Sequence, residues 1–283
     1  MSKPKLDEFR VPYFQPKQAE KDISKHRFSL ASFDCSAKPF STGSKDDDKQ
    51  ALSDIGHELD TLQDRMHSQT RERVLLVLQG MDTSGKDGTI RAVFHEVDPL
   101  GLRIAAFRAP TLDESAHDFL WRIHHYTPAG GELAVFNRSH YEDVLVPRVL
   151  GTLDDDATQR RYAHIRAFEA LLADSHTTVV KCFLHISKDE QRKRLQARVD
   201  DPTKHWKFDP SDLDARKQWD AYQSAYEDAL AATSTPEAPW YIVPADSKSH
   251  RNLMVATILA DTMRKLDLQY PPGKMDLEGV VVK

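Results

Sequence analysis

Short apolar runs alternate with amphipathic stretches along most of the chain. The runs that predict buried strands cover residues 74–79, 102–107, 132–136, 178–186 and 240–243. The stretches that predict helices lie near 88–97, 112–125, 139–149, 156–173, 187–199, 211–231 and 248–266. This alternation is typical of an α/β fold, in which helices cover both faces of a parallel sheet and ligands bind at the carboxyl ends of its strands.

A further amphipathic helix is predicted before the first strand, packed on the main domain or on a second subunit. Its apolar positions step by three and four, at Leu52, Ile55, Leu59, Leu62 and Met66. Residues 1–50 contain scattered prolines and no sustained periodicity, which predicts an arm that lies on the domain or is partly irregular. We therefore expect a catalytic domain over 51–270 and a tail over 271–283.

A polar segment interrupts the helical pattern between residues 199 and 211, where Asp200, Pro202 and Pro210 occur. Two predicted helices flank it. This arrangement suits a movable helical lid over about residues 187–215.

Composition narrows the possible partners. The 283 residues have a net charge of -5 and contain two cysteines, which disfavours a general nucleic-acid binder and a disulfide framework. No apolar run approaches the roughly 18 residues of a membrane helix, and the start of the chain has no apolar signal core. We expect a cytoplasmic protein with no nucleic-acid or membrane partner.

The most informative segment follows the first predicted strand. Gly80, Gly85 and Lys86 have the Gly-x4-Gly-Lys spacing, and a helical pattern follows. Glycines let backbone amides converge on an anion, the helix adds its positive N-terminal end, and a lysine can bridge phosphoryl oxygens. We predict a phosphate-binding loop; the alternative is an ordinary glycine turn with a surface lysine.

Two carboxylates accompany this loop. Asp87 stands where most such loops have a Ser or Thr hydroxyl for magnesium, and Asp82 lies within the loop. Both would repel a bound phosphate unless a divalent cation lay between them, so Asp82 is predicted to bind Mg²⁺ directly or through its waters. Asp87 could instead cap the following helix.

Further polar side chains follow the strand that ends near residue 136. Asn137 occupies the place of an acidic metal-site residue, although its neutral amide weakens a direct metal contact. Arg138 would project into the site and neutralise a phosphoryl group in transfer. The alternative is a salt bridge from Arg138 to Glu142 or Asp143.

The lid segment is locally basic. Arg194 and Arg198 share one face of a predicted helix, and Lys204 and Lys207 follow it. A charge run is usually a solvated face. Beside a phosphate loop, however, it indicates a clamp that closes over an anionic chain.

Three segments together resemble family-2 polyphosphate kinases: residues 80–89, 119–124 and 137–143, supported by Trp206-Lys207-Phe208 in the lid region. The resemblance covers roughly residues 50–270. It implies a P-loop kinase fold like that of thymidylate kinase, dependence on Mg²⁺, and reversible phosphoryl transfer between inorganic polyphosphate and nucleotides. Glu142-Asp143 resembles the subgroup that acts on both AMP and ADP.

The resemblance also suggests roles for residues in this chain. Arg122 would face phosphates, Glu142 would accommodate the acceptor nucleotide, and Asp143 would organise magnesium with Asp82. The complete expected phosphate-binding set is Gly80, Ser84, Gly85, Lys86, Asp87, Gly88, Thr89, Arg122, Arg198, Lys204 and Lys207. Metal ligands are expected at Asp82, Asn137 and Asp143, and catalytic roles at Lys86, Arg138 and Arg194.

We therefore predict in-line transfer of a terminal phosphoryl group from polyphosphate to ADP and AMP. The expected partners are inorganic polyphosphate, adenine or guanine nucleotides and further copies of the chain. Two alternatives remain: an ATP-dependent nucleoside monophosphate kinase of similar fold, and a nucleotide-binding module without turnover.

Overall fold

The computed structural model describes residues 5–13, 28–273 and 282. At its centre lies a five-stranded, wholly parallel sheet in the order β2-β3-β1-β4-β5. The strands are β1 (Arg73–Gln79), β2 (Leu102–Ala106), β3 (Leu133–Asn137), β4 (Thr177–His185) and β5 (Trp240–Pro244). All five predicted strands are present, because each apolar run supplies residues that are buried in the sheet.

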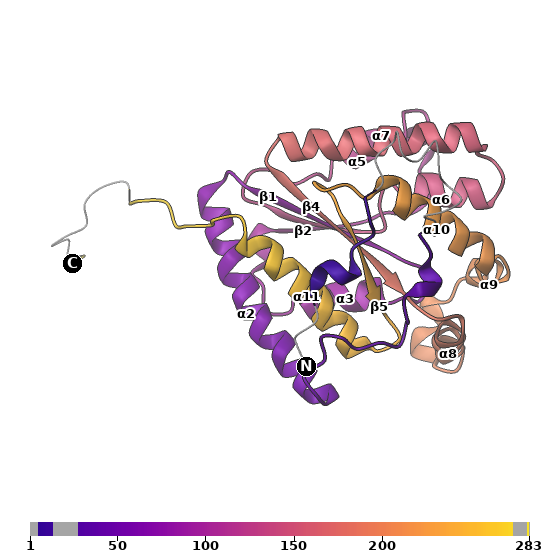
Figure 1. Ribbon diagram of the computed structural model, residues 1–283, viewed down its shortest axis with the longest axis horizontal. Helices are drawn as coiled ribbons and strands as arrows, with labels where there is room; N and C mark the ends of the chain where they lie inside the picture. The colour runs from indigo at the N-terminus through magenta and orange to yellow at the C-terminus, as the bar shows by residue number, and fades with distance from the viewer. Residues whose placement is uncertain (1–4, 14–27, 274–281, 283) are drawn as a thin grey trace.

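Helices cover both faces of this sheet. In Figure 1, α7 (Asp155–Asp174) and α10 (Trp219–Thr233) lie above it, and α2 (Lys45–Gln69), α3 (Lys86–Val93) and α11 (Lys248–Arg264) lie below it. The expected α/β fold is confirmed. No helix in the described part of the chain is long and apolar enough to cross a membrane.

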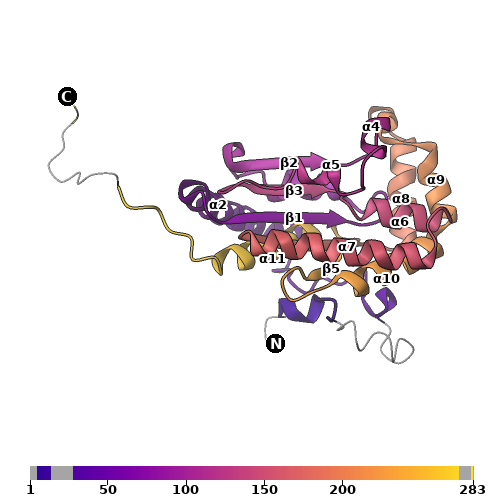
Figure 2. The same cartoon turned by 90° about the horizontal axis from the view of Figure 1, so that it is seen from above.

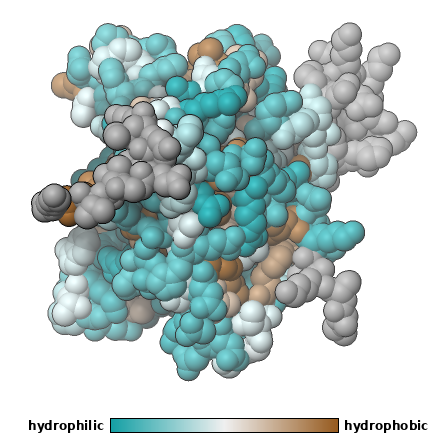
Figure 3. Space-filling model, turned by 90° about the vertical axis from the view of Figure 1, so that its left-hand side faces the viewer, coloured by the Kyte–Doolittle hydropathy of each residue, from teal (hydrophilic) through white to brown (hydrophobic). Residues whose placement is uncertain are grey.

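The carboxyl ends of the strands all point to one edge of the molecule, toward α6 (Glu142–Val149), α8 (Lys188–Val199) and α9 (Pro210–Lys217), as Figure 2 shows. Hydrophilic residues cover most of the opposite end, where apolar residues show only in small groups (Figure 3). Any site built from strand ends therefore lies on the side of α8 and α9.

The helix expected from Leu52 begins earlier, at Lys45. Ser44 caps it, since the Ser44 hydroxyl accepts from the Asp47 amide and the Asp47 carboxylate accepts from the Ser44 amide. The first turn contains acidic residues, which interact favourably with the helix dipole. Because this turn has no apolar periodicity, the sequence pattern did not include it. The helix packs along α11, as one of the two expected possibilities required.

The described parts of the N-terminal arm lie on the domain. Arg10 forms an antiparallel bridge with Tyr241 in the edge strand β5, and its guanidinium donates to the Tyr241 hydroxyl at 2.6 and 2.8 Å. Val11 and Leu30 are buried in the core. The arm thus covers an edge that would otherwise expose unpaired backbone groups. Residues 1–4 and 14–27 lie outside the described part, as does most of the expected tail.

Two predicted helices are each divided. The stretch 112–125 forms α4 (Leu112–Ser115) and α5 (Trp121–His124), because the Asp118 carboxylate accepts from the Leu120 amide and starts a local turn instead of a continuous helix. The stretch 211–231 breaks at Gln218, between α9 and α10, where Trp219 enters the core. The lid segment forms α8, a 3-10 helix over Pro202–Lys207, and α9.

Candidate active site

The phosphate-loop motif lies between the end of β1 and the start of α3. Gly80 and Gly85 have positive φ angles of 151° and 104°, and a Cβ on Gly80 would lie 2.7 Å from the Leu184 carbonyl oxygen. Only glycine tolerates this combination of backbone and contact. The loop therefore depends on the two glycines that mark it in the sequence.

Lys86 begins α3 and is almost entirely buried. Its ammonium donates to the Gly80 carbonyl oxygen at 2.6 Å, and burial lowers the pKa of Lys86. In the described residues, the hydroxyls of Thr83, Ser84 and Thr89 have no hydrogen-bond partner. Buried polar atoms without partners are rare, and of these three only Thr83 lines the opening in front of the loop.

Arg138 lies at the end of β3 and faces the loop. Its guanidinium donates to Asp82 Oδ1 at 2.9 Å, instead of to Glu142 or Asp143 as the alternative interpretation required. Burial opposes its charge, but Glu142 and Asp82 hold the pKa of Arg138 above its ordinary value. Its φ of 62° is unusual for a residue with a side chain and is a form of strain found at functional sites.

The two loop carboxylates lie near different partners. Asp82 is paired with Arg138, and Asp87 accepts from the Asn137 amide at 2.8 Å. Burial opposes ionisation of Asp87, but Asn137 and the cations Lys86 and Lys207 hold its pKa below the ordinary value. Both carboxylates line the same opening, and Asp87 does so in ionised form.

That opening is a basic hollow of about 690 Å³. Four Asp side chains line it. The Lys and Arg side chains that line it number nine: Lys86, Arg108, Arg138, Arg194, Arg198, Lys204, Lys207, Lys248 and Arg251. They come from the phosphate loop, two strand ends, the lid segment and α11. Such an excess of cations in one concave surface favours a polyanion, despite the net negative charge of the chain.

Most predicted site residues meet in this basic hollow. Those that line it are Asp82, Gly85, Lys86, Asp87, Gly88, Asn137, Arg138, Arg194, Arg198, Lys204 and Lys207. Gly80, Ser84 and Thr89 lie within or beneath the loop and do not line the opening. Glu142 also does not line it. Burial raises the pKa of Glu142, and the nearby charges of Arg138 and Lys86 oppose this rise, so its carboxyl group lies close to both cations.

Arg194 differs from its predicted role as a charge-spreading residue. Its guanidinium nitrogens all donate within the protein: to Glu190 at 2.8 Å, and to the carbonyl oxygens of Thr83, Ser84, Ala245 and Asp246 at 2.7 to 3.1 Å. These contacts tie α8 to the phosphate loop and to the residues after β5. Arg194 therefore supports the loop from behind.

Arg122 and Asp143 also differ from their predicted positions. Arg122 donates to Asp143 Oδ2 at 2.9 Å, and neither side chain lines the basic hollow. Consecutive residues on a helix point about 100° apart, so Glu142 faces the loop while Asp143 faces away from it. Asp143 therefore does not share the basic hollow with Asp82 in this structure, and the expected magnesium pair stays a prediction.

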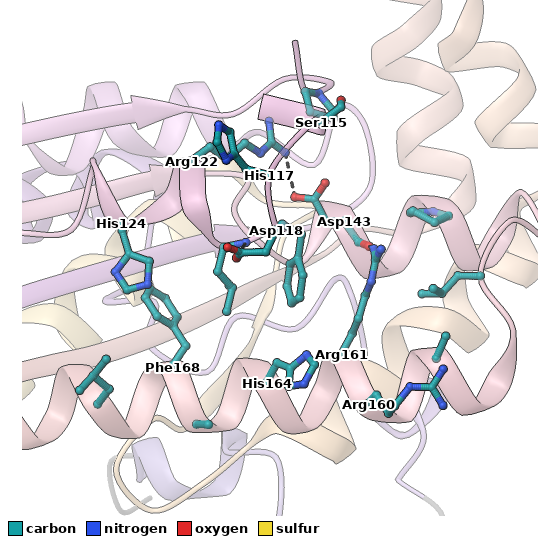
Figure 4. A pocket seen from close by; sticks show the side chains of 18 residues that line it. Ser115, His117, Asp118, Arg122, His124, Asp143, Arg160, Arg161, His164 and Phe168 are labelled. Carbon is teal, nitrogen blue, oxygen red and sulfur yellow. Dashed lines mark hydrogen bonds and ion pairs between the residues drawn. The ribbon is translucent and has the colours of Figure 1, made fainter. Parts of the chain in front are cut away.

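Arg122 and Asp143 border a second hollow of about 920 Å³, between the segment 110–124 and the helices α6 and α7 (Figure 4). Three histidines line it, His117, His124 and His164, together with Phe119, Phe168 and the cations Arg160 and Arg161. This second hollow combines flat rings with positive charge. Phe119, Arg122 and His124 belong to the segment 119–124 noted in the sequence, but no pattern there predicted a hollow.

Sequence reasoning missed several residues of the basic hollow. Arg108 follows β2, and Lys248 and Arg251 belong to α11, where the sequence pattern predicted only a closing helix. Trp206 is 79% exposed at the lid, with the Lys207 ammonium 4.8 Å from its ring centroid. The sequence analysis noted Trp206 only as part of the resemblance; a tryptophan among lysines and arginines was the signal for its place in the hollow.

Comparison with known proteins agrees with this geometry. The model of the family Polyphosphate kinase 2 matches residues 42–271. An AMP/ADP-polyphosphate phosphotransferase of Meiothermus ruber is 49% identical over 91% of this chain and 96% of its own length. An ADP-polyphosphate phosphotransferase of Rhodopseudomonas palustris is 44% identical over 75% of this chain and 78% of its own length.

A solved structure shares the whole fold. The crystal structure of polyphosphate kinase 2 from Arthrobacter aurescens superposes with a TM-score of 0.90 at 43% identity, covering 98% of this chain and 95% of that one. The match includes the strands and helices that carry the phosphate loop. On the family match and these relatives, the chain belongs to the polyphosphate kinase 2 family.

Proposed function

We propose that this protein transfers the terminal phosphoryl group of inorganic polyphosphate to AMP and ADP, and that the reaction is reversible. The observation that carries this proposal is the basic hollow around Lys86, which can neutralise a phosphate chain longer than one nucleotide supplies. The AMP/ADP-polyphosphate phosphotransferase of Meiothermus ruber, similar over nearly its full length, supports the choice of acceptors.

In this proposal the phosphate loop holds the phosphoryl group in transfer. Lys86 turns from the Gly80 carbonyl to the phosphoryl oxygens, and the amides at the start of α3 donate to them. Arg138, already charged and facing the loop, stabilises the charge that develops between donor and acceptor. Arg194 keeps the loop in place through its carbonyl contacts, and closure of the segment 187–215 excludes water.

The residues of the hollow fit a magnesium ion. In the described ranges, no group of three or more His, Cys, Asp or Glu side chains is arranged to hold a metal. Mg²⁺, however, commonly uses one or two carboxylates together with waters and substrate phosphates. Asp82 and Asp87 would hold it, with the Asn137 amide beside them. When bound, the ion supplies charge neutralisation at the phosphoryl oxygens.

We place the acceptor nucleotide in the second hollow. Its histidines and phenylalanines suit a flat base, and Arg160 and Arg161 suit the nucleotide's negative charge. Glu142 and Asp143 are neighbours on α6, one beside the phosphate loop and one in the second hollow, so the first turn of α6 lies between the two substrates. Adenine and guanine are the proposed bases.

One assay tests the main proposal. The purified protein is incubated with Mg²⁺ and either AMP or ADP, with polyphosphate or ATP as the sole phosphoryl donor. We expect ADP or ATP to form from polyphosphate. Product formation with ATP as the only effective donor would indicate a nucleoside monophosphate kinase instead, and nucleotide binding without product would indicate a non-catalytic module.

A substitution tests where the nucleotide binds. Arg160 is exposed on α7 at the edge of the second hollow, so a change there has little effect on the core. Arg160→Glu is expected to raise the KM for AMP and ADP about tenfold while the KM for polyphosphate stays unchanged. An increase in the polyphosphate KM alone would reverse the assignment of the two hollows.

We also propose that the protein forms a homo-oligomer. The edge strand β2 exposes Ile104, which is 51% exposed, and Leu100 just before the strand is 83% exposed. Apolar residues at an open strand edge favour contact with another chain. Size-exclusion chromatography with light scattering gives the mass of the protein in solution. A monomer at micromolar concentration would contradict the proposal.

A further inference from the structure

Arg251 lies beneath the phosphate loop, in the first turn of α11. The residue is 2% exposed, and its Nη1 donates to the Ser84 carbonyl oxygen at 3.0 Å. Its Nε and Nη2 donate to the Asn252 side-chain oxygen at 3.1 and 2.8 Å. A Cβ on Gly85 would lie only 1.9 Å from Nη1. The guanidinium therefore occupies the space that the glycine leaves open.

Within the described part of the chain, the charge of Arg251 has no carboxylate partner. Within residues 5–13 and 28–273, its hydrogen bonds reach only a backbone carbonyl and a neutral amide. Burial, together with the neighbouring Arg194, lowers the pKa of Arg251 to about 9. An arginine buried without an acid is costly, because water no longer solvates the charge and no anion replaces that solvation.

Two further features increase that cost. Arg194 donates to the same Ser84 carbonyl oxygen at 3.1 Å, so two guanidinium groups lie close to one acceptor. The first turn of α11 contains Lys248 as well and has no acidic residue. A helix N-terminus carries partial positive charge, so these cations oppose the helix dipole. Desolvation, the neighbouring cations and the helix dipole therefore all act against the charge of Arg251 in the free protein.

A neutral donor could hold the Ser84 carbonyl without this cost. What a buried cation adds is an electrostatic attraction for an anion on the other side of the loop, where Arg251 also lines the basic hollow. A polyanion bound at the loop amides would supply the negative charge that the fold itself lacks. The same charge therefore destabilises the free protein and stabilises the complex with the polyanion.

We propose that Arg251 is a positioning residue for the phosphate donor: it fixes the Ser84 carbonyl so that the loop amides face the hollow, and its charge is compensated only when the anionic chain is bound. The inference rests on the proposed function for the identity of that chain. It assigns to α11 a part in substrate binding, beyond the packing against α2 and α3.

Two substitutions in the full chain test this inference. Arg251→Met removes the charge but keeps much of the volume, and Arg251→Lys keeps the charge. For the methionine variant we expect a Tm of the free protein equal to or above that of the wild type, and a loss of most of the Tm increase that polyphosphate causes. The KM for polyphosphate should rise about 10- to 100-fold, the nucleotide KM should stay unchanged, and lysine should restore part of the loss.

Asn252→Asp gives a second test that keeps Arg251 in place. It puts a carboxylate where a neutral oxygen now lies 2.8 Å from the guanidinium. We expect the free protein to become more stable while polyphosphate binds more weakly, because the protein now compensates the charge itself. Arg264→Met is the matched control: this arginine lies at the other end of α11, is exposed and pairs with Glu58.

The outcomes separate the possible roles. A lower Tm of the free Arg251→Met protein with an unchanged polyphosphate KM would show an ordinary structural residue and overturn the inference, as would Asn252→Asp binding polyphosphate as well as the wild type. Failure of the proposed function looks different: the wild type would then form no product from polyphosphate. Thermal shifts with polyphosphate alone still test Arg251 in that case.

Discussion

Two groups of buried cations, one around β4 and one beneath the phosphate loop, differ in whether an acid accompanies them. Lys181 on β4 is fully buried, and its ammonium donates to Glu169 at 2.6 Å, to the Tyr141 hydroxyl at 3.0 Å and to the Thr233 carbonyl at 2.8 Å. All three of its donors are thus satisfied. Beneath the phosphate loop, Arg251 has no acid within the described chain.

The comparison separates charge that stabilises the fold from charge that serves a ligand. Glu169 also accepts from Tyr141 at 2.9 Å and contacts His140 at 3.3 Å; despite burial, Lys181 and His140 hold the pKa of Glu169 below its ordinary value. This network holds His140 and Tyr141 in place, two and three residues after Arg138 in the chain. Arg251 donates only to carbonyl and amide oxygens, so its charge is uncompensated within the described chain, as expected of a cation that serves an anionic ligand.

The largest effect is expected from breaking the balanced group. Lys181→Met leaves Glu169 ionised and buried without its cation, so the free energy of unfolding should fall by about 3–5 kcal/mol. Urea unfolding followed by circular dichroism measures this change. The double variant Lys181→Met/Glu169→Gln is the control, since it removes both charges and should recover part of the loss. A single variant as stable as the wild type would remove the contrast between the two groups.

The opposite pattern is expected at the phosphate loop. Lys86→Met should lower kcat by about 10²–10³-fold, the cost of removing one donor to a developing charge. The free energy of unfolding should change by less than about 1 kcal/mol, because relief of a buried charge offsets the lost bond to Gly80. Steady-state kinetics measures kcat, and urea unfolding of the same sample measures the free energy of unfolding. A large loss of stability would contradict the prediction. Lys49→Met is the control, since Lys49 is exposed on α2 and does not line the basic hollow, and it should leave kcat unchanged.

The difference between the two groups also explains what the sequence could predict. The phosphate loop is a local motif: its glycines, its lysine and the strand before them lie within one short segment, so the pattern contains the site. The five strands were predictable for a similar reason, because short aliphatic runs between amphipathic stretches are typical of strands that helices cover on both faces.

Arg251 could not be predicted in this way. It reaches the Ser84 carbonyl across 167 residues of sequence, and only the packing of α11 against α3 brings the two together. Within its own helix it follows Lys248 on a polar first turn, which resembles a solvated face. Asp143 shows the converse: it follows Glu142 directly in the sequence, but the helix directs Glu142 toward the phosphate loop and Asp143 toward the second hollow.

The smallest expected effect comes from His250, which lies next to Arg251 but can lose its charge. It is fully buried, and its Nε2 accepts from the Phe40 amide at 3.2 Å, so the ring is neutral there. Burial lowers the pKa of His250 to about 4, against the opposing charge of Asp48 and with that of Lys38. In the unfolded chain the value returns to about 6.5.

The sign of the pH dependence follows from proton binding. Between pH 6.5 and 4 the unfolded chain holds more protons at His250 than the folded protein does, so stability falls as the pH falls through this range. The loss from this group should be about 3 kcal/mol at pH 4. His250→Gln keeps an acceptor for the Phe40 amide and cannot titrate, so its urea midpoint should fall less steeply with pH than that of the wild type. Parallel curves would mean that His250 is already protonated in the folded protein, and that α11 tolerates a second buried cation beside Arg251.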